Sequence, residues 1–234
     1  AIVVPSAFIQ RELVRFDSIF TSPKVRLVEN GLDARFTQTA FEDRFSGRPL
    51  RQVGIVGRAS PEKGQDVLPA LARRFPDMDF HVLGDAAFSS ADFYAALQRD
   101  SPSNVHFHGW VEDLPAKVRE IGLQLCLVPS RCPASTPGQS FEAAPLVPLQ
   151  MAALSCLVVV RRLGALEDVA ENLQMRTFDR DNELIPMIEA LRAHSAAETC
   201  DQCRRSHGLT LAMYNHSTFH ERLRDLLNML FAEK

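Results

Sequence analysis

Short runs of aliphatic and β-branched residues alternate along most of this chain with longer segments of helical periodicity. The apolar runs predict strands at Ile2–Val4, Val25–Val28, Val53–Val56, Asp79–Leu83, Val105–Phe107, Leu123–Val128 and Leu157–Val160. The segments between them predict helices near Asp66–Arg74, Ala91–Arg99, Leu114–Ile121, Leu146–Leu154 and Leu163–Asn172. Because the strand runs are continuously apolar, both faces of the sheet are expected to be buried. The sequence therefore predicts an α/β fold, a doubly wound parallel sheet of the Rossmann-like type.

The last third of the chain has a different pattern, and no strand is expected after about Arg176. Helices are predicted at Asn182–His194, Ala196–His207 and Thr218–Ala232. The last helix carries its large apolar residues on one face, and Thr218 with Glu221 forms a predicted capping box at its start. The sheet is thus expected to be followed by a helical C-terminal tail.

The composition of the chain excludes some classes of binding partner and some cellular locations. The formal net charge of −3 gives no basic field for nucleic acid or an anionic membrane, so no nucleic-acid partner is expected. The longest apolar stretch, Met151–Val160, falls far short of the roughly 20 residues that span a bilayer. The first residues lack the basic region and cleavage site of a secretory signal. Two of the cysteines lie in or beside apolar strand-like runs, which indicates reduced thiols and a cytoplasmic location.

Cys200 and Cys203 are spaced as metal ligands, with His207 close by. Zinc needs about four ligands, and no second Cys/His pair stands at a matching spacing. We therefore expect no metal here and interpret the two cysteines as exposed or half-buried helix thiols. His81, His106 and His108 lie in or beside strands, where a structural role is expected.

A turn rich in cations follows the third predicted strand. Gly57 ends the strand and admits positive φ, which lets the backbone approach a ligand. Ser60 is expected to cap the next helical turn, with Pro61 at its first position. Arg58 supplies a planar fork of donors and Lys63 a compact charge, a combination that suits a diphosphate. The alternative is a solvated loop that carries two cations.

A second polar segment follows the strand that ends at Val128. Glu142 and Gln150 flank a turn that opens a helix, eight residues apart. A carboxylate in a loop and an amide one to two helical turns later can both point into one cleft and bind hydroxyl groups. Ligands of doubly wound sheets bind at the carboxyl ends of the strands, where both segments are expected.

Together these segments resemble the retaining GT-B glycosyltransferases of family four, in their C-terminal, donor-binding half. Asn30–Asp33, "NGLD", is similar to the family's interdomain NGVD turn, and "VGRASPEKG" is similar to its GR-x-x-x-x-KG loop. "VHFHGWVEDL" resembles its glycine turn after a strand, "LVPSR" its VxPS strand end, and "EAAPLVPLQMAA" its glutamate-x7-glutamate element. The matching elements occur in the family's order between Ala1 and Asn172.

The resemblance implies a role for each matching residue. Gly57, Arg58 and Lys63 would hold the diphosphate of a nucleotide-sugar. Glu142 would contact the transferred sugar, and Gln150 the ribose. The donor-binding set also includes three residues of the later motifs, with backbone N–H groups of the last two facing phosphate: Ser130, Leu146 and Val147. Arg58, Lys63 and Glu142 form the expected catalytic set.

Three departures from the family pattern affect this interpretation. Gln150 replaces the second glutamate, and an amide brings hydrogen bonds without charge. Ala144 and Pro145 replace Phe-Gly, and proline lacks an N–H for phosphate. Residues 1–35 are expected to be a remnant of the acceptor domain with the interdomain linker, so a fragment that is inactive alone is expected. The nucleotide-sugar domain would span residues 36–215 and a crossing helix residues 216–234.

The family resemblance implies retaining transfer of a hexosyl group from a UDP- or GDP-linked sugar to a saccharide or lipid-linked acceptor, without a cofactor. Its commonest setting is the assembly of bacterial polysaccharides. Peripheral membrane association would come through the acceptor domain, and the exposed apolar stripe of the last helix would favour a homodimer. Two alternatives stay open: a degenerate, non-catalytic binding module, favoured by Gln150 and Pro145, and another reaction on the same fold, such as that of an epimerase or a phosphorylase.

Overall fold

The computed structural model describes residues 2–22, 25–86, 90–132 and 142–232. Its strands are β1 (Ile2–Val4), β2 (Val25–Leu27), β3 (Gln52–Val56), β4 (Asp79–Leu83), β5 (Val105–Phe107), β6 (Leu125–Val128), β7 (Leu157–Arg161) and β8 (Arg176–Phe178). Its α-helices are α1 (Ala7–Phe16), α2 (Ala34–Thr37), α3 (Leu68–Arg74), α4 (Ala91–Asp100), α5 (Leu114–Glu120), α6 (Val147–Ala153), α7 (Ala165–Asn172), α8 (Leu184–Ala193), α9 (Ala196–Tyr214) and α10 (His216–Ala232). Short 3₁₀ turns are η1 (Ser18–Thr21), η2 (Pro61–Lys63), η3 (Gln65–Val67) and η5 (Asp181–Glu183).

The main sheet is parallel, with the strand order β5-β4-β3-β6-β7-β8. The chain builds outward from β3 to β5, then crosses back to place β6 on the other side of β3. This reversal between β3 and β6 opens a crevice at the carboxyl ends of the two strands, where ligands of such sheets bind. The doubly wound parallel sheet predicted from the apolar runs is confirmed.

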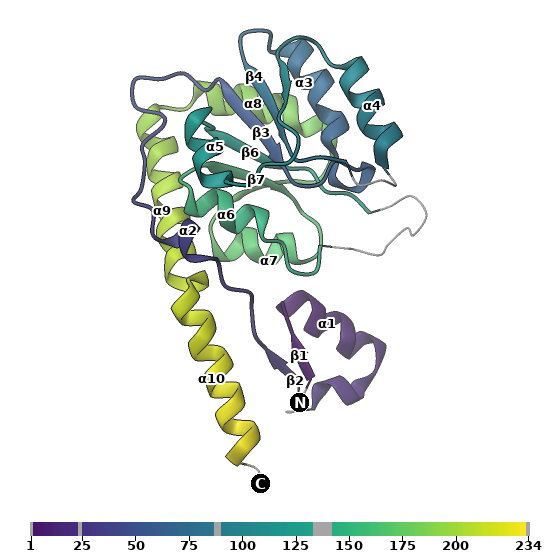
Figure 1. Cartoon of the computed structure of the whole chain (residues 1–234), viewed down its shortest axis with the longest axis vertical. Helices are drawn as coiled ribbons and strands as arrows, with labels where there is room; N and C mark the ends of the chain where they lie inside the picture. The colour runs from purple at the N-terminus through teal and green to yellow at the C-terminus, as the bar shows by residue number, and fades with distance from the viewer. Residues whose placement is uncertain (1, 23–24, 87–89, 133–141, 233–234) are drawn as a thin grey trace.

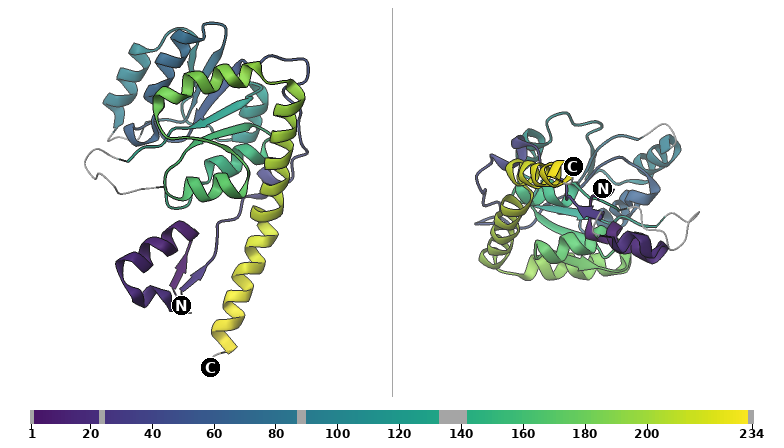
Figure 2. Two further views of the ribbon diagram at one scale, coloured as in Figure 1. Left: turned by 180° about the vertical axis from the view of Figure 1, so that it is seen from behind. Right: turned by 90° about the horizontal axis from the view of Figure 1, so that it is seen from below.

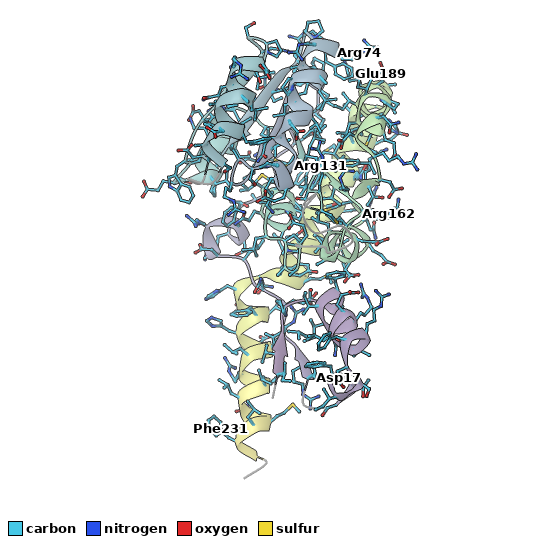
Figure 3. The ribbon with its side chains drawn as sticks, turned by 90° about the vertical axis from the view of Figure 1, so that its right-hand side faces the viewer. Asp17, Arg74, Arg131, Arg162, Glu189 and Phe231 are labelled. Carbon is cyan, nitrogen blue, oxygen red and sulfur yellow. The ribbon has the colours of Figure 1, made fainter. Side chains whose placement is uncertain are left out.

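Helices cover both faces of the sheet, as Figure 1 shows. One face packs against α3 and α8 and the other against α5, α6 and α7, with α9 lying on α6. Within β6, Leu125 and Leu127 join the first core and Cys126 and Val128 the second. At the top of Figure 3, Arg74 of α3 pairs with Glu189 of α8. Burial on both faces explains the continuous apolar runs.

The prediction that strands stop at about Arg176 is wrong, because β8 spans Arg176–Phe178 and pairs with β7. Its three residues alternate Arg, Thr and Phe, and only Phe178 is buried. An edge strand needs one apolar face, so this run lacked the apolar continuity of the central strands. Arg161, which ends β7, covers the Phe178 ring at 4.9 Å.

The helical tail is confirmed, but its details differ from expectation. Helix α9 continues past His207 to Tyr214, and α10 begins at His216. The predicted capping box at Thr218 is wrong, because Asn215 precedes the helix and its Oδ1 accepts the Thr218 N–H at 2.8 Å. Cys200 and Cys203 are buried in α9 instead of exposed or half-buried.

An N-terminal unit of β1, α1 and β2 lies apart from the main sheet, beside the extended α10 (Figures 1 and 2). Its two strands pair in parallel. Arg11 of α1 meets Asp168 of α7 at 2.7 Å, and Leu32 donates to the Tyr214 carbonyl at 2.7 Å. Contacts alone do not divide the chain into domains, so the boundaries at residues 35 and 215 stay predictions. Within the described residues, no helix combines the length and apolarity required to cross a membrane.

Candidate functional site

The turn after β3 is fixed by close backbone contacts. Gly57 has φ of 125° and donates to the Leu83 carbonyl at 2.9 Å. The Gly57 carbonyl lies 2.1 Å from where a Cβ on Gly84 would stand, so a side chain there would collide. Pro61 opens η2 as expected, but the Ser60 side chain makes no capping hydrogen bond. The cap expected from Ser60 is therefore absent, and a 3₁₀ turn takes the place of the expected helical turn.

The two cations of this turn point to different partners. The Arg58 side chain is 56% exposed and its guanidinium donates to Glu62 at 2.7 Å. Burial would raise the pKa of the Glu62 carboxyl, but its hydrogen bonds and the Arg58 charge outweigh burial and lower the pKa. The Lys63 ammonium lies 2.5 Å from Glu142 Oε1. The sequence pattern predicts that both cations contact one ligand; in the structure each cation is paired with a different carboxylate, and the shared ligand stays a prediction.

Glu142 is the residue on which the second segment converges. It is 8% exposed, and its Oε1 accepts a hydrogen bond from Ser130 at 2.6 Å as well as the Lys63 ammonium. The Glu142 carbonyl accepts from the Ala165 N–H at 2.9 Å, which ties this residue to the start of α7. Both side-chain bonds fall on Oε1, so Oε2 is the atom that can accept a further hydrogen bond.

The two site segments are joined directly by backbone contacts. Arg131 donates its N–H to the Glu62 carbonyl at 2.8 Å. Gly64 has φ of 74°, and a Cβ there would stand 2.4 Å from the Pro129 carbonyl oxygen. The turn after β3 and the strand end after β6 therefore form one packed unit.

A cavity of about 200 Å³ lies beside Glu142. Its lining includes Lys63, Ser130, Glu142, Leu146 and Val147, with Pro145 and Pro148 at the same helix start. Helix α6 has a proline in its first turn, where the missing N–H costs no intrahelical bond. The structure thus brings five of the eight expected site residues around one small space.

A larger cavity of about 470 Å³ adjoins it, since Val56 and Val147 line both. Gly57, Arg58 and Gln150, the remaining expected site residues, line this second space. Its other lining residues include four that the sequence reasoning did not single out: Arg35, Asp85, Trp110 and Glu112. Three of these four follow the carboxyl ends of β4 and β5, namely Asp85, Trp110 and Glu112. Ligands of such sheets bind at the carboxyl ends of the strands, so inspection of every strand end in the sequence would have found these three residues.

No metal centre is formed by the residues that the structure describes, since they contain no group of three or more His, Cys, Asp or Glu that could hold an ion. His207 bonds the Ala153 carbonyl through Nδ1 at 2.9 Å. Burial raises the pKa of the Cys203 thiol, which disfavours the thiolate that a metal would need. Cys200 and Cys203 therefore belong to the packing of α9.

Comparison with protein families identifies the family of this chain. The family described as glycosyl transferases group 1 matches residues 51–193, more than half of the chain. The chain belongs to this family. The matched residues run from β3 to α8 and include every expected site residue. No curated protein matches the sequence significantly.

Solved structures of glycosyltransferases share the fold. The Anabaena protein HepE (Alr3699), solved with UDP and glucose, is similar at 19% identity and a TM-score of 0.77, over 97% of this chain and 62% of HepE. Sucrose-phosphate synthase from Thermosynechococcus elongatus is similar at 18% identity and a TM-score of 0.76, over 99% of this chain and 58% of the synthase. The C-terminal domain of LpcC from Francisella tularensis is similar at 17% identity and a TM-score of 0.60, over 80% of this chain and 100% of the LpcC domain. The group 1 chain therefore spans less than two thirds of HepE and of the synthase and has the fold of a GT-B C-terminal half.

Proposed function

We propose that this chain binds the nucleotide-sugar donor of a retaining glycosyltransferase of family four. The observation that carries the proposal is the pair of adjoining cavities at the reversal between β3 and β6. The smaller is lined by the buried Glu142 carboxylate and the Lys63 ammonium bonded to it, and the larger is lined by Arg58 and Gln150. A sugar diphosphate needs hydroxyl acceptors at one end and cations at its centre, and this arrangement provides both.

Each residue has a distinct role in the proposal. Glu142 Oε2 accepts a hydrogen bond from a hydroxyl group of the hexosyl group, while Lys63 neutralises the carboxylate and faces the diphosphate. Arg58 turns from Glu62 to the diphosphate, a short step for an exposed side chain. Gln150 bonds the ribose. Leu146 and Val147 present the start of α6, and Ser130 holds Glu142 in place.

In the complete enzyme, the diphosphate leaves as the glycosidic bond breaks, and negative charge grows on it. Once Arg58 has turned from Glu62, Arg58 and Lys63 would both lie beside this growing charge and would stabilise it. We propose that the two cations supply the charge that a metal would otherwise bring, so that donor binding survives a chelator. The acceptor, a saccharide or lipid-linked saccharide, would reach the sugar from the side of the N-terminal unit, in a cytoplasmic setting that suits the free buried thiols.

Calorimetry with UDP, GDP and UDP-glucose tests the proposal, and UDP-glucose comes first because HepE was solved with UDP and glucose. We expect binding to the chain and a loss of about tenfold or more in affinity for Arg58→Ala, since hydrogen bonds to charged groups contribute about 1.5–3 kcal/mol. Arg48→Ala, at another exposed arginine, is the matched control and should bind normally. In the complete enzyme, Arg58→Ala should lower turnover by about 10²–10³-fold. Nucleotide binding that is equal in both variants would refute the role of Arg58.

One alternative is a degenerate binding module that has lost catalysis, and Gln150 is the observation that favours it. An amide at this position provides no charge to order a ribose. Complete enzyme that binds the donor but neither transfers nor hydrolyses it, with the Gln150→Glu variant regaining transfer, would support this alternative.

A further inference from the structure

Arg131 contacts both segments of the site, although it lines neither cavity. It follows Ser130, the residue whose hydroxyl group bonds Glu142. Its backbone N–H bonds the carbonyl of Glu62, the residue that precedes Lys63. A side chain that lies outside both cavities can act on a ligand only through the residues that line them.

The Arg131 side chain forms a charged bridge between two 3₁₀ turns. Its Nη1 atom lies 2.9 and 2.8 Å from the two carboxylate oxygens of Asp66 in η3. Its Nη2 atom lies 2.7 Å from Asp181 Oδ2 in η5, and Asp181 also pairs with Arg161 at the end of β7. The side chain of Arg131 is 28% exposed, which limits screening of these pairs by solvent. Arg131 therefore connects the turn after β3 to the body of the sheet.

The two contacts of Arg131 with this turn lie on either side of Lys63. The Glu62 carbonyl precedes the lysine and the Asp66 carboxylate follows it, so one arginine holds the turn at both ends. Lysine has a flexible four-carbon stem, and its ammonium keeps a defined place more readily where the backbone that carries it is fixed. The contacts of Arg131 therefore help to determine where the Lys63 ammonium lies.

A ring of bonds closes at Glu142. Its Oε1 atom accepts from the Lys63 ammonium at 2.5 Å and from the Ser130 hydroxyl group at 2.6 Å. Lys63 leads back to Arg131 through the turn, and Ser130 leads back to it through one peptide bond. Because Oε1 is held from two sides, the direction of Oε2 is fixed as well. Oε2 is the atom proposed to accept a hydroxyl group of the sugar.

We propose that Arg131 is a positioning residue, which holds the Lys63 ammonium and the Glu142 carboxylate in place at the sugar end of the donor site. This inference rests on the proposed function, because it assumes that Glu142 contacts the sugar. Partly exposed ion pairs contribute little to the stability of a whole protein, so loss of the Arg131 side chain should act locally. Arg58 and Gln150 line the other cavity, so the nucleoside end should keep most of its affinity.

Calorimetry on the whole chain with UDP, GDP and their glucose conjugates tests this inference. Arg131→Met keeps the backbone bond to Glu62 but removes the charged bridge. We expect it to weaken the nucleotide-sugar by about tenfold or more, the effect of misplacing one hydrogen bond to a charged group, and the free nucleotide much less. Arg131→Lys restores one charge and should regain part of the lost affinity. Arg192→Met is the matched control, because Arg192 pairs with Asp77 at 2.6 Å, is similarly exposed and lines neither cavity.

A double-mutant cycle separates positioning from general damage. Asp66→Ala removes the other end of the same contact. Arg131→Met combined with Asp66→Ala should therefore reduce nucleotide-sugar affinity little more than either substitution alone. The denaturation midpoints of these variants should stay close to that of the unmodified chain.

The outcomes separate this inference from the proposed function. Nucleotide-sugar binding that is unchanged in Arg131→Met would overturn the positioning role and leave the donor site standing. Equal weakening of the free nucleotide and the nucleotide-sugar would also overturn it, as would fully additive losses in the cycle. If the unmodified chain binds a nucleotide but no nucleotide-sugar, this inference alone fails. If it binds neither, both proposals fail.

Discussion

Single residues decide how the two site segments meet. Gly64 lies against the Pro129 carbonyl, and the adjacent Lys63 reaches Glu142, which is 79 positions away in sequence. The same short turn therefore provides the close backbone contact and the ion pair. The "KG" pair in the sequence is enough to predict a left-handed glycine next to a lysine. The ion-pair partner of that lysine cannot be predicted in this way, because the pairing depends on the crossover that brings β6 beside β3.

Gly64→Ala tests the packing of the two segments. The alanine would meet the Pro129 carbonyl oxygen at 2.4 Å and would have to keep a φ of 74°. The left-handed conformation alone costs an L-residue roughly 1–2 kcal/mol, and the collision adds to it. We expect a lower denaturation midpoint and weaker nucleotide binding.

Gly208→Ala is the control, since Gly208 lies within α9 with nothing within 4 Å of a new Cβ. Alanine is favoured over glycine in a helix interior by about 1 kcal/mol, so this variant should be more stable. Equal stability of the two variants in urea would contradict the packing described for Gly64.

At the scale of elements, the sequence predicted the central strands and the edge strand β5 to within two residues but missed the other edge strand, β8. Continuous apolar runs identify β3, β4, β6 and β7 because both faces are buried. β8 shows no such run, since only Phe178 is buried in it. The start of α10 was misplaced because Asn215 and Thr218 both favour caps, and only the tertiary path of the chain selects one.

Histidines join the neighbouring strands β3, β4 and β5 near one edge of the sheet. His81 contacts His108 at 3.0 Å and Gln52 at 2.7 Å, and His106 bonds Asp79 at 2.9 Å. Burial, with repulsion from His108 and His106, lowers the pKa of His81 to about 4 against the opposing effect of Asp79. His81 is therefore neutral in the folded protein at a pH where its unfolded form takes up a proton.

This predicts a loss of stability in mild acid. The folded pKa of about 4 lies below the unfolded value of 6.5, so the contribution of His81 is complete above pH 6.5 and is lost as pH falls toward 4. The free energy of unfolding should decrease by up to about 3 kcal/mol over this interval. His81→Gln removes the titrating group, and denaturation midpoints from pH 7 to pH 4 should change less in this variant. An identical pH profile in both proteins would contradict the assignment.

The whole molecule combines a packed α/β body with an exposed extension. The N-terminal unit and α10 carry most of the exposed large apolar residues in the described part of the chain, including Ile2, Val3, Phe16, Leu227 and Met229. Figure 3 shows Phe231 near the far end of α10, away from the sheet. Exposed apolar surface of this extent favours association.

We expect the chain to self-associate as its concentration rises, which sedimentation velocity would measure. Leu227→Gln combined with Leu230→Gln should shift the equilibrium toward the monomer, because both side chains are exposed on α10. Arg48→Gln, on the body of the molecule, is the control. A monomer at every concentration would contradict the expected homodimer.

The strand order also has a consequence for biosynthesis. The cation-bearing turn follows β3, whereas its carboxylate partner and α6 come only after β6 has crossed back to pair with β3. A nascent polypeptide released from the ribosome tunnel only as far as Arg131 would carry Arg58 and Lys63 without Glu142. The two adjoining cavities are therefore completed late in translation, when Gln150 has emerged, although β3, β4 and β5 can pair earlier.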